Sequence, residues 1–208
     1  MIGADPESRR SFILAHTRLQ SPPHTPELAL HLADEITPIW RMTEEALEEI
    51  GLPPPFWAFA WAGGQALARY ILDAPETVAG LRVVDFASGS GIVAVAAARA
   101  GARHVLAADI DGFCGAALAL NAEANGVAVD FTDQDLLDQP PPEADLILAG
   151  DICYEKPLAE RVMAWLDAGR SYFPREGLVR LAEYQVPTTR ELEDMEVKRT
   201  AVWTFPSR

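Results

Sequence analysis

A single segment, residues 83–94, does most to limit the folds open to this chain. It reads VVDFASGSGIVA, a hydrophobic strand that passes through Gly89 and Gly91 directly into a helix. Glycine lets the backbone approach a ligand closely, and the N-terminus of the following helix favours negative charge. Such a turn is typical of the carboxyl edge of a parallel sheet, where open α/β folds bind their ligands.

The chain around this segment alternates between strand and helix patterns. Short runs of Val, Leu, Ile and Ala are separated by longer helical stretches, and two of these stretches end at Gly101 and Gly126. This spacing builds βαβ units, hence an α/β fold with a doubly wound, mostly parallel sheet. We predict strands over residues 81–86, 104–108, 127–131, 144–149, 182–186 and 197–205, and helices over residues 65–72, 91–100, 112–125 and 156–166.

The glycine turn fits two kinds of nucleotide ligand. Gly89, Gly91 and Ala94 satisfy the dinucleotide pattern G-x-G-x-x-A, and Asp109 lies 18 residues after Gly91, where a carboxylate can reach a ribose. Asp85, just before the turn, favours S-adenosylmethionine over NAD, because a carboxylate repels a pyrophosphate but tolerates a cationic sulfonium. A turn without any ligand stays open as a third interpretation.

Three motifs occur in order along the chain. Residues 56–67 read FWAFAWAGGQAL, residues 85–91 fit D-x-G-x-G-x-G except that Ala87 stands at the first glycine, and residues 150–154 read GDICY. Together they resemble the family of electron-transfer-flavoprotein β-subunit lysine methyltransferases, which are class I S-adenosylmethionine-dependent methyltransferases related to the ribosomal-protein lysine methyltransferases. The segment VKRTAVW at residues 197–203 resembles bacterial members of this family.

The resemblance implies a set of site residues. The tryptophan–glycine segment would lie against S-adenosylmethionine, the acids after the third strand would face the adenine amino group, and the D-x-x-Y motif would face the substrate amine. Structural roles stay open as alternatives. Trp61 could pack in the core, Asp133 and Asp135 could lie in a solvated turn, and Asp151 could cap the following helix. The implied cofactor-binding residues are Trp61, Gly63, Gln65, Asp85, Ala87, Ser88, Gly89, Gly91, Asp109, Ile110, Asp133, Asp135 and Gly150, and the implied catalytic residues are Asp151 and Tyr154.

The implied reaction is methyl transfer to a protein lysine, with the electron-transfer flavoprotein β-subunit as the favoured substrate. A lysine ammonium, with a reference pKa of about 10.4, must lose a proton before its nitrogen can attack. Asp151 can accept a hydrogen bond from the amine and Tyr154 can orient the alkyl chain, while solvent takes the proton. A ribosomal protein or small amine as substrate, an NAD-dependent oxidoreductase and a non-catalytic binding protein are the alternatives.

The resembling family has a seven-stranded, Rossmann-like sheet, and this sequence supplies six strands. In the family a fifth strand precedes a segment like DAGR, residues 167–170 here, but this segment follows Leu166 immediately. Either the protein lacks a central strand, or residues are missing from the sequence between Leu166 and Asp167. We expect the second, because losing a buried strand should cost more than the typical stability of about 5–15 kcal/mol.

Residues 1–55 lack the regular alternation of strand and helix patterns found in the rest of the chain. We predict an N-terminal arm of helix (residues 11–19), strand (27–33) and helix (38–50), packed on a methyltransferase domain of residues 56–208. The acidic run ELED at residues 191–194 is expected to be a solvated loop, with recognition of a basic substrate segment as the lesser alternative.

Charge and cysteine usage narrow the partners and the compartment. The chain of 208 residues has 17 basic and 31 acidic residues, a formal charge of −14, which disfavours nucleic acid and anionic membranes. Two cysteines and no apolar leader or membrane-spanning run indicate the cytoplasm. The four histidines show no metal-ligand spacing with the cysteines, so no metal site is expected.

Overall fold

The computed structural model describes residues 5–34, 54–152, 156–168, 179–188, 193 and 195–204. The helix predicted over residues 38–50 lies outside these ranges, as do Cys153 and Tyr154.

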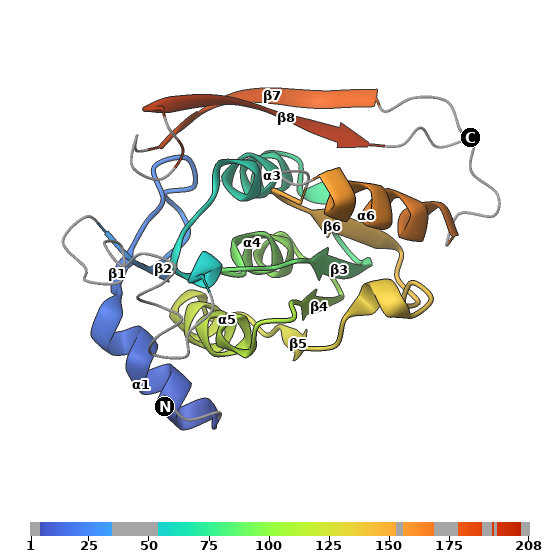
Figure 1. Ribbon diagram of the computed structural model, residues 1–208. Helices are drawn as coiled ribbons and strands as arrows, with labels where there is room; N and C mark the ends of the chain where they lie inside the picture. The colour runs from blue at the N-terminus through green and yellow to red at the C-terminus, as the bar shows by residue number, and fades with distance from the viewer. Residues whose placement is uncertain are drawn as a thin grey trace.

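The central sheet has four parallel strands in the order β5-β4-β3-β6 (Figure 1). Val84 of β3 lies opposite Leu106 on one side and Ile147 on the other. Since all four strands run the same way, their carboxyl ends meet at one edge. The predicted parallel order is confirmed, although β5 begins three residues later than expected. The strands are β3 (Arg82–Phe86), β4 (His104–Ala108), β5 (Asp130–Thr132) and β6 (Leu146–Ala149).

Helices cover both faces of this sheet. Val83 packs into a core cluster with residues of α3, α4 and α5, whereas its neighbour Val84 packs with Val162 and Trp165 of α6. This alternation follows from the period of two along a strand, which sends successive side chains to opposite faces. The helices are α3 (Ala62–Asp73), α4 (Ile92–Arg99), α5 (Gly112–Asn125) and α6 (Lys156–Ala168).

The N-terminal arm comprises α1 (Pro6–His16) and a short antiparallel pair, β1 (Arg18–Gln20) and β2 (Leu30–Leu32). The predicted helix begins earlier than expected because Asp5 caps it, accepting bonds from the backbone N–H groups of residues 7 and 8. The strand predicted over residues 27–33 is shorter in the structure, where it forms β2; β1 was not predicted.

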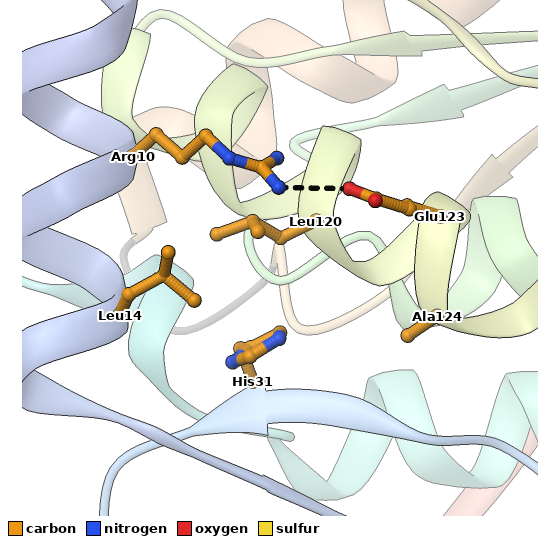
Figure 2. A pocket seen from close by; sticks show the side chains of 6 residues that line it. All are labelled: Arg10, Leu14, His31, Leu120, Glu123 and Ala124. Carbon is orange, nitrogen blue, oxygen red and sulfur yellow. Dashed lines mark hydrogen bonds and ion pairs between the residues drawn. The ribbon is translucent and has the colours of Figure 1, made fainter.

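The arm is fastened to α5 by a buried amide. Asn121, fully buried, accepts a bond from His31 N of β2 at 2.7 Å and donates to Ser90 O of the glycine turn at 2.8 Å. Beside this contact, residues of α1, β2 and α5 line an open surface pocket of about 230 Å³ (Figure 2). Arg10 and Glu123 form an ion pair at 2.9 Å across its rim. The pocket is lined by Arg10, Leu14, His31, Leu120, Glu123 and Ala124.

The two terminal strands form a separate antiparallel hairpin of β7 (Val179–Pro187) and β8 (Val197–Thr204). The hairpin lies over α3 in Figure 1, and Val186 and Val202 are buried there against Ala62 and Ala66. Both strands were predicted; their position, on a helix and outside the main sheet, was not.

α6 runs through Leu166 and Asp167 to Ala168, so this sequence forms one continuous helix at the expected break. That residues are missing from the sequence between Leu166 and Asp167 stays a prediction. Within the described ranges, β6 pairs with β3 alone and no fifth strand lies beside it. Of the six strands predicted for the methyltransferase domain, four form the parallel sheet and two form a separate hairpin.

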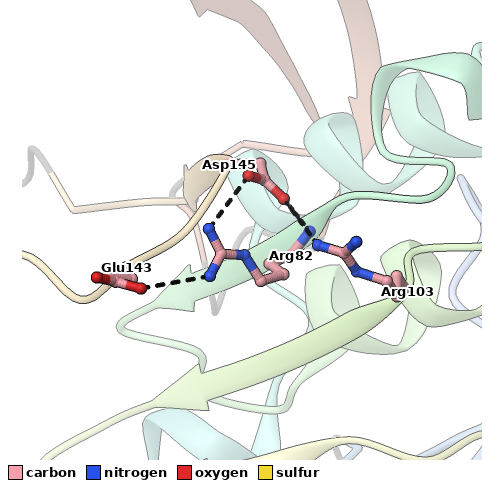
Figure 3. A network of polar contacts seen from close by, with 4 residues as sticks. All are labelled: Arg82, Arg103, Glu143 and Asp145. Carbon is pink, nitrogen blue, oxygen red and sulfur yellow. Dashed lines mark hydrogen bonds and ion pairs between the residues drawn. The ribbon is translucent and has the colours of Figure 1, made fainter.

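The edge of the sheet opposite the glycine turn carries a surface ion network (Figure 3). Arg82, at the start of β3, lies 3.4 Å from Asp145 and 3.5 Å from Glu143, and Arg103 lies 3.5 Å from Asp145. These side chains are largely exposed, and exposed pairs contribute about 0–1 kcal/mol each. These ion pairs order the starts of the strands, whereas the predicted ligand-binding residues lie at the other edge.

None of the described helices has the length and apolar character to cross a membrane.

We expect Asn121→Ala to lower the free energy of unfolding by about 2–3 kcal/mol, because His31 N and Ser90 O would each lose a buried partner. Urea unfolding followed by far-ultraviolet circular dichroism measures the change. Gln139→Ala, which removes an exposed amide, serves as the control and should change stability by less than about 0.5 kcal/mol. Equal effects of the two substitutions would contradict a structural role for Asn121.

Candidate active site

The turn between β3 and α4 is held in the left-handed region at three positions. Ala87, Gly89 and Gly91 have φ of 54°, 51° and 76°. Gly91 N donates to Ser88 O at 2.7 Å, and a Cβ at Gly91 would collide with Leu118 of α5. Ala87 occupies the position of the motif's first glycine and adopts the left-handed conformation that glycine would adopt there. The alanine therefore adds backbone strain but does not change the shape of the turn.

Asp85 lies beneath this turn and not on its surface. Its side chain is 1% exposed, and Oδ2 accepts a bond from Ala94 N in the first turn of α4 at 2.9 Å. Burial raises the pKa of Asp85 to about 8, and the negative charge of Asp109 adds to the rise. The residue therefore fixes the start of α4, the helix end that faces a ligand.

Asp109 joins the end of β4 to the turn. Its Oδ2 accepts a bond from Gly89 N at 2.9 Å and its Oδ1 one from Asp111 N at 3.1 Å. The next residue, Ile110, is 74% exposed, and the Ser88 hydroxyl is buried without a hydrogen-bond partner. The structure thus brings Asp109, Ile110, Ser88 and Gly89 together at one edge.

The acids after β5 have two different environments. Asp133 is exposed. Asp135 caps the short 3-10 helix Leu136–Asp138 by accepting from Leu137 N at 2.9 Å, and it lies 3.7 Å from Arg161. Asp133 is therefore available for a ligand, whereas the carboxylate of Asp135 already has structural partners.

Asp151 connects the end of β6 to the start of α3. Its Oδ2 accepts a bond from Gly64 N at 2.7 Å, and Gly63 N donates to the same carboxylate. A Cβ at Gly63 would lie 2.5 Å from Asp151 Oδ1, and one at Gly150 would lie 3.1 Å from the Cα of Gly64. The glycines permit this approach, and Asp151 itself adopts a φ of 53° to make it. Asp151 thus caps α3, not the helix that follows it in sequence.

The charge state of Asp151 is set by its surroundings. Burial is the main influence and raises the pKa of this carboxyl above its usual value, against the lowering effect of the two N–H donors. The residue as a whole is only partly buried. Tyr154, its predicted partner, lies outside the described residues.

Trp61 and Gln65 flank the same helix start. Trp61 is partly buried, donates through Nε1 to Phe56 O at 3.0 Å, and packs edge-on against Phe56 and Phe59. Gln65 is 4% exposed; its Nε2 donates to Ala60 O at 2.7 Å while Oε1 is buried without a partner. An unsatisfied buried oxygen costs about 1–3 kcal/mol, so Gln65 offers an acceptor that a bound ligand would satisfy.

Glu193, from the acidic run that we expected to be a solvated loop, is buried at the start of α3. Its side chain is 4% exposed, Oε1 accepts from Ala62 N at 2.8 Å, and Oε2 pairs with Lys198. The expectation of a solvated loop is wrong for this residue. Its acidic neighbours gave no signal that one of them turns inward, because the partner donor lies about 130 residues earlier.

Comparison with known proteins finds one matching family model and several similar proteins. The family model "Ribosomal protein L11 methyltransferase (PrmA)" matches residues 65–166. The electron transfer flavoprotein beta subunit lysine methyltransferase of Xenopus laevis is 37% identical over 94% of this chain and 86% of its own length. The human protein of that name is 33% identical over 97% of this chain and 83% of its own length. A solved ribosomal protein L11 methylase from Lactobacillus delbrueckii subsp. bulgaricus has 29% identity and a TM-score of 0.45 over 61% of this chain and 63% of that chain.

The parallel sheet, its glycine turn and these matches define a class I methyltransferase. The chain belongs to the electron transfer flavoprotein beta subunit lysine methyltransferase family. The near-full-length relatives named above come from a frog and from human, so they do not support a bacterial origin.

The alignment with the Xenopus protein contains gaps in this chain. It runs over 215 positions but takes in 94% of 208 residues, about 196, which leaves about 19 positions without a residue of this chain. The family-model match ends at residue 166.

We expect Ala87→Gly to raise the free energy of unfolding by about 0.5–1 kcal/mol. Relief of the left-handed strain, about 1–2 kcal/mol, outweighs the greater entropy of glycine in the unfolded chain. Chemical denaturation measures the gain, and Ala98→Gly inside α4 is the matched control, expected to lose about 1 kcal/mol. A loss at residue 87 equal to that at residue 98 would rule out the strain.

We expect stability to fall as pH rises from about 4 to about 8, in part because of Asp85. Its folded-state pKa is raised to about 8, so across this range the folded protein retains a proton that the unfolded chain releases. Asp85→Asn keeps an acceptor for Ala94 N and removes the titration. Urea unfolding at pH 5 and pH 8 should show a smaller loss in the variant; parallel losses in both proteins would refute this assignment.

Proposed function

We propose that this protein is an S-adenosylmethionine-dependent lysine N-methyltransferase that acts on the β-subunit of electron transfer flavoprotein. One observation carries the proposal: Asp151 of the D-x-x-Y motif is fixed by Gly63 and Gly64 at the same sheet edge as the glycine turn. The family relatives, named for that activity and substrate, support it.

The residues around the glycine turn fit the nucleoside part of the cofactor. Asp109 follows β4 where a ribose would lie, Ile110 offers an exposed apolar side chain for a base, and Ser88 offers an unpartnered hydroxyl. Asp133, exposed after β5, is assigned to the adenine amino group. S-adenosylmethionine, when bound, supplies an electrophilic methyl group on a cationic sulfur. The carboxylates of Asp109 and Asp133 suit that cation and disfavour a pyrophosphate, which argues against NAD. Asp85 does not add to this effect at neutral pH, because burial raises its pKa to about 8.

The chain's own contribution to transfer is positioning of the amine. Asp151 has two lone-pair sites used by Gly63 and Gly64, and its remaining oxygen surface can accept a bond from a target lysine. Because the lysine nitrogen attacks only after losing a proton, the carboxylate aims the amine while solvent takes that proton. Orientation of this kind supplies much of the rate in a bimolecular transfer. Tyr154 is assigned to the alkyl chain of the lysine.

A ribosomal protein is the second candidate substrate. A Pelotomaculum thermopropionicum ribosomal protein L11 methyltransferase is 47% identical, but only over 34% of this chain and 23% of its own length. We propose the cytoplasm as compartment, supported by Cys114, a buried thiol that forms no disulfide. Neither nucleic acid nor a membrane is proposed as a partner, in keeping with the charge of −14.

The test is methylation of purified electron transfer flavoprotein with labelled S-adenosylmethionine, in parallel with a cell extract. The expected result is label on a lysine of the β-subunit. Label on a ribosomal protein instead would transfer the assignment to the second substrate. Calorimetry with S-adenosylhomocysteine and NAD completes the test, and tight binding of NAD alone would overturn the methyltransferase assignment.

We expect Asp151→Asn to lower kcat by at least about 100-fold, since the variant keeps an acceptor for Gly64 N but loses the charge that holds the amine. Affinity for S-adenosylhomocysteine, measured by calorimetry, should change by less than about threefold. Asp130→Asn is the matched control: Asp130 is exposed, begins β5 at the opposite edge and pairs with His104, so activity should not change. Full activity of the residue-151 variant would disprove its role.

A further inference from the structure

The first turn of α3 carries two carboxylates from different parts of the chain. Asp151 accepts from Gly64 N at 2.7 Å, and Glu193, from the β7–β8 connection, accepts from Ala62 N at 2.8 Å. The two donors lie within one helical turn, so both carboxylates lie at the same end of α3. The free N–H groups and the helix dipole offset part of the repulsion between two such charges.

A lysine ammonium already pairs with one of these two carboxylates. Lys198 of β8 pairs with Glu193 Oε2, while Glu193 Oε1 remains on the backbone of α3. Burial is the main cause of the raised pKa of Asp151; Glu193 raises that pKa further and Lys198 lowers it, so both charges act on Asp151. Glu193 is 4% exposed and Lys198 41%, so the ammonium approaches from the open side of a buried acid.

We propose that Glu193 is a second substrate-positioning residue and that Lys198 is an internal competitor that the target lysine displaces. This inference rests on the proposed function, in which Asp151 holds the amine. A target lysine arrives as an ammonium, the same group that Lys198 presents. It binds between Asp151 and Glu193 Oε2 and then loses its proton to solvent. With Lys198 released into solvent, the acidic pair exchanges one ammonium for another and no net charge is buried.

Competition of this kind has a measurable consequence. Only the fraction of molecules in which Lys198 is released can bind the target, so the apparent affinity is the intrinsic affinity reduced by that fraction. Removing the ammonium of residue 198 should therefore lower KM for the protein substrate and leave kcat nearly unchanged. A purely structural role for Lys198 predicts the reverse, because the buried Glu193 would lose its partner.

The experiment compares steady-state methylation of the flavoprotein β-subunit by the wild type and variants. We expect Lys198→Met to lower KM for the β-subunit about fivefold, with kcat within about twofold. Glu193→Gln keeps an acceptor for Ala62 N and should raise this KM about tenfold, with KM for S-adenosylmethionine unchanged. Arg180→Met, which removes an exposed hairpin ion pair with Glu183, is the matched control and should change neither constant.

The outcomes separate this inference from the proposed function. An unchanged or raised KM in Lys198→Met overturns internal competition; Lys198→Gln, which retains a hydrogen-bond donor for Glu193, repeats the test if the first variant unfolds at a lower temperature. An unchanged KM in Glu193→Gln overturns the positioning role. If the wild type methylates no lysine, the proposed function fails, and calorimetric affinity of the β-subunit for wild type and Lys198→Met still decides whether Lys198 competes.

Discussion

The site depends on the contact between the backbone at the start of α3 and the carboxylate of Asp151 at the end of β6. This contact ties a helix from the first third of the chain to the last strand of the sheet. It requires the missing side chain at Gly63, since a Cβ there would lie 2.5 Å from the carboxylate oxygen. The tryptophan–glycine motif and the D-x-x-Y motif are therefore two halves of one structural unit.

Acidic residues perform the same task repeatedly at this edge. Asp85 accepts from the first turn of α4, Asp109 from Gly89 of the turn, and Asp151 and Glu193 from the first turn of α3. Each satisfies backbone donors that a helix start or tight turn leaves free. Some of the chain's acidic residues are thus structural, and those at this edge that keep their charge suit a cationic cofactor and a cationic lysine.

The two terminal strands lie outside the main sheet. In the described part of the chain no fifth strand lies beside β6, and β7 and β8 pair with each other and bury Val186 and Val202 on α3. Glu193 accepts from Ala62 N at the start of α3 and pairs with Lys198 of β8. Packing of the hairpin on α3 therefore accompanies a second carboxylate at the helix start that Asp151 caps.

The sequence alone determined the parallel sheet, its crossover helices, the glycine turn and the positions of Asp85, Asp109 and Asp151, because these depend on local periodicity and on residues at strand ends. Tertiary structure decided which backbone donors those acids meet, that Asp151 caps α3, that Asn121 fastens the arm, and that Glu193 turns inward. Such pairings join residues far apart in the chain, and no local pattern encodes them. They depend on the packing of helices and hairpin that brings the partners within hydrogen-bond distance.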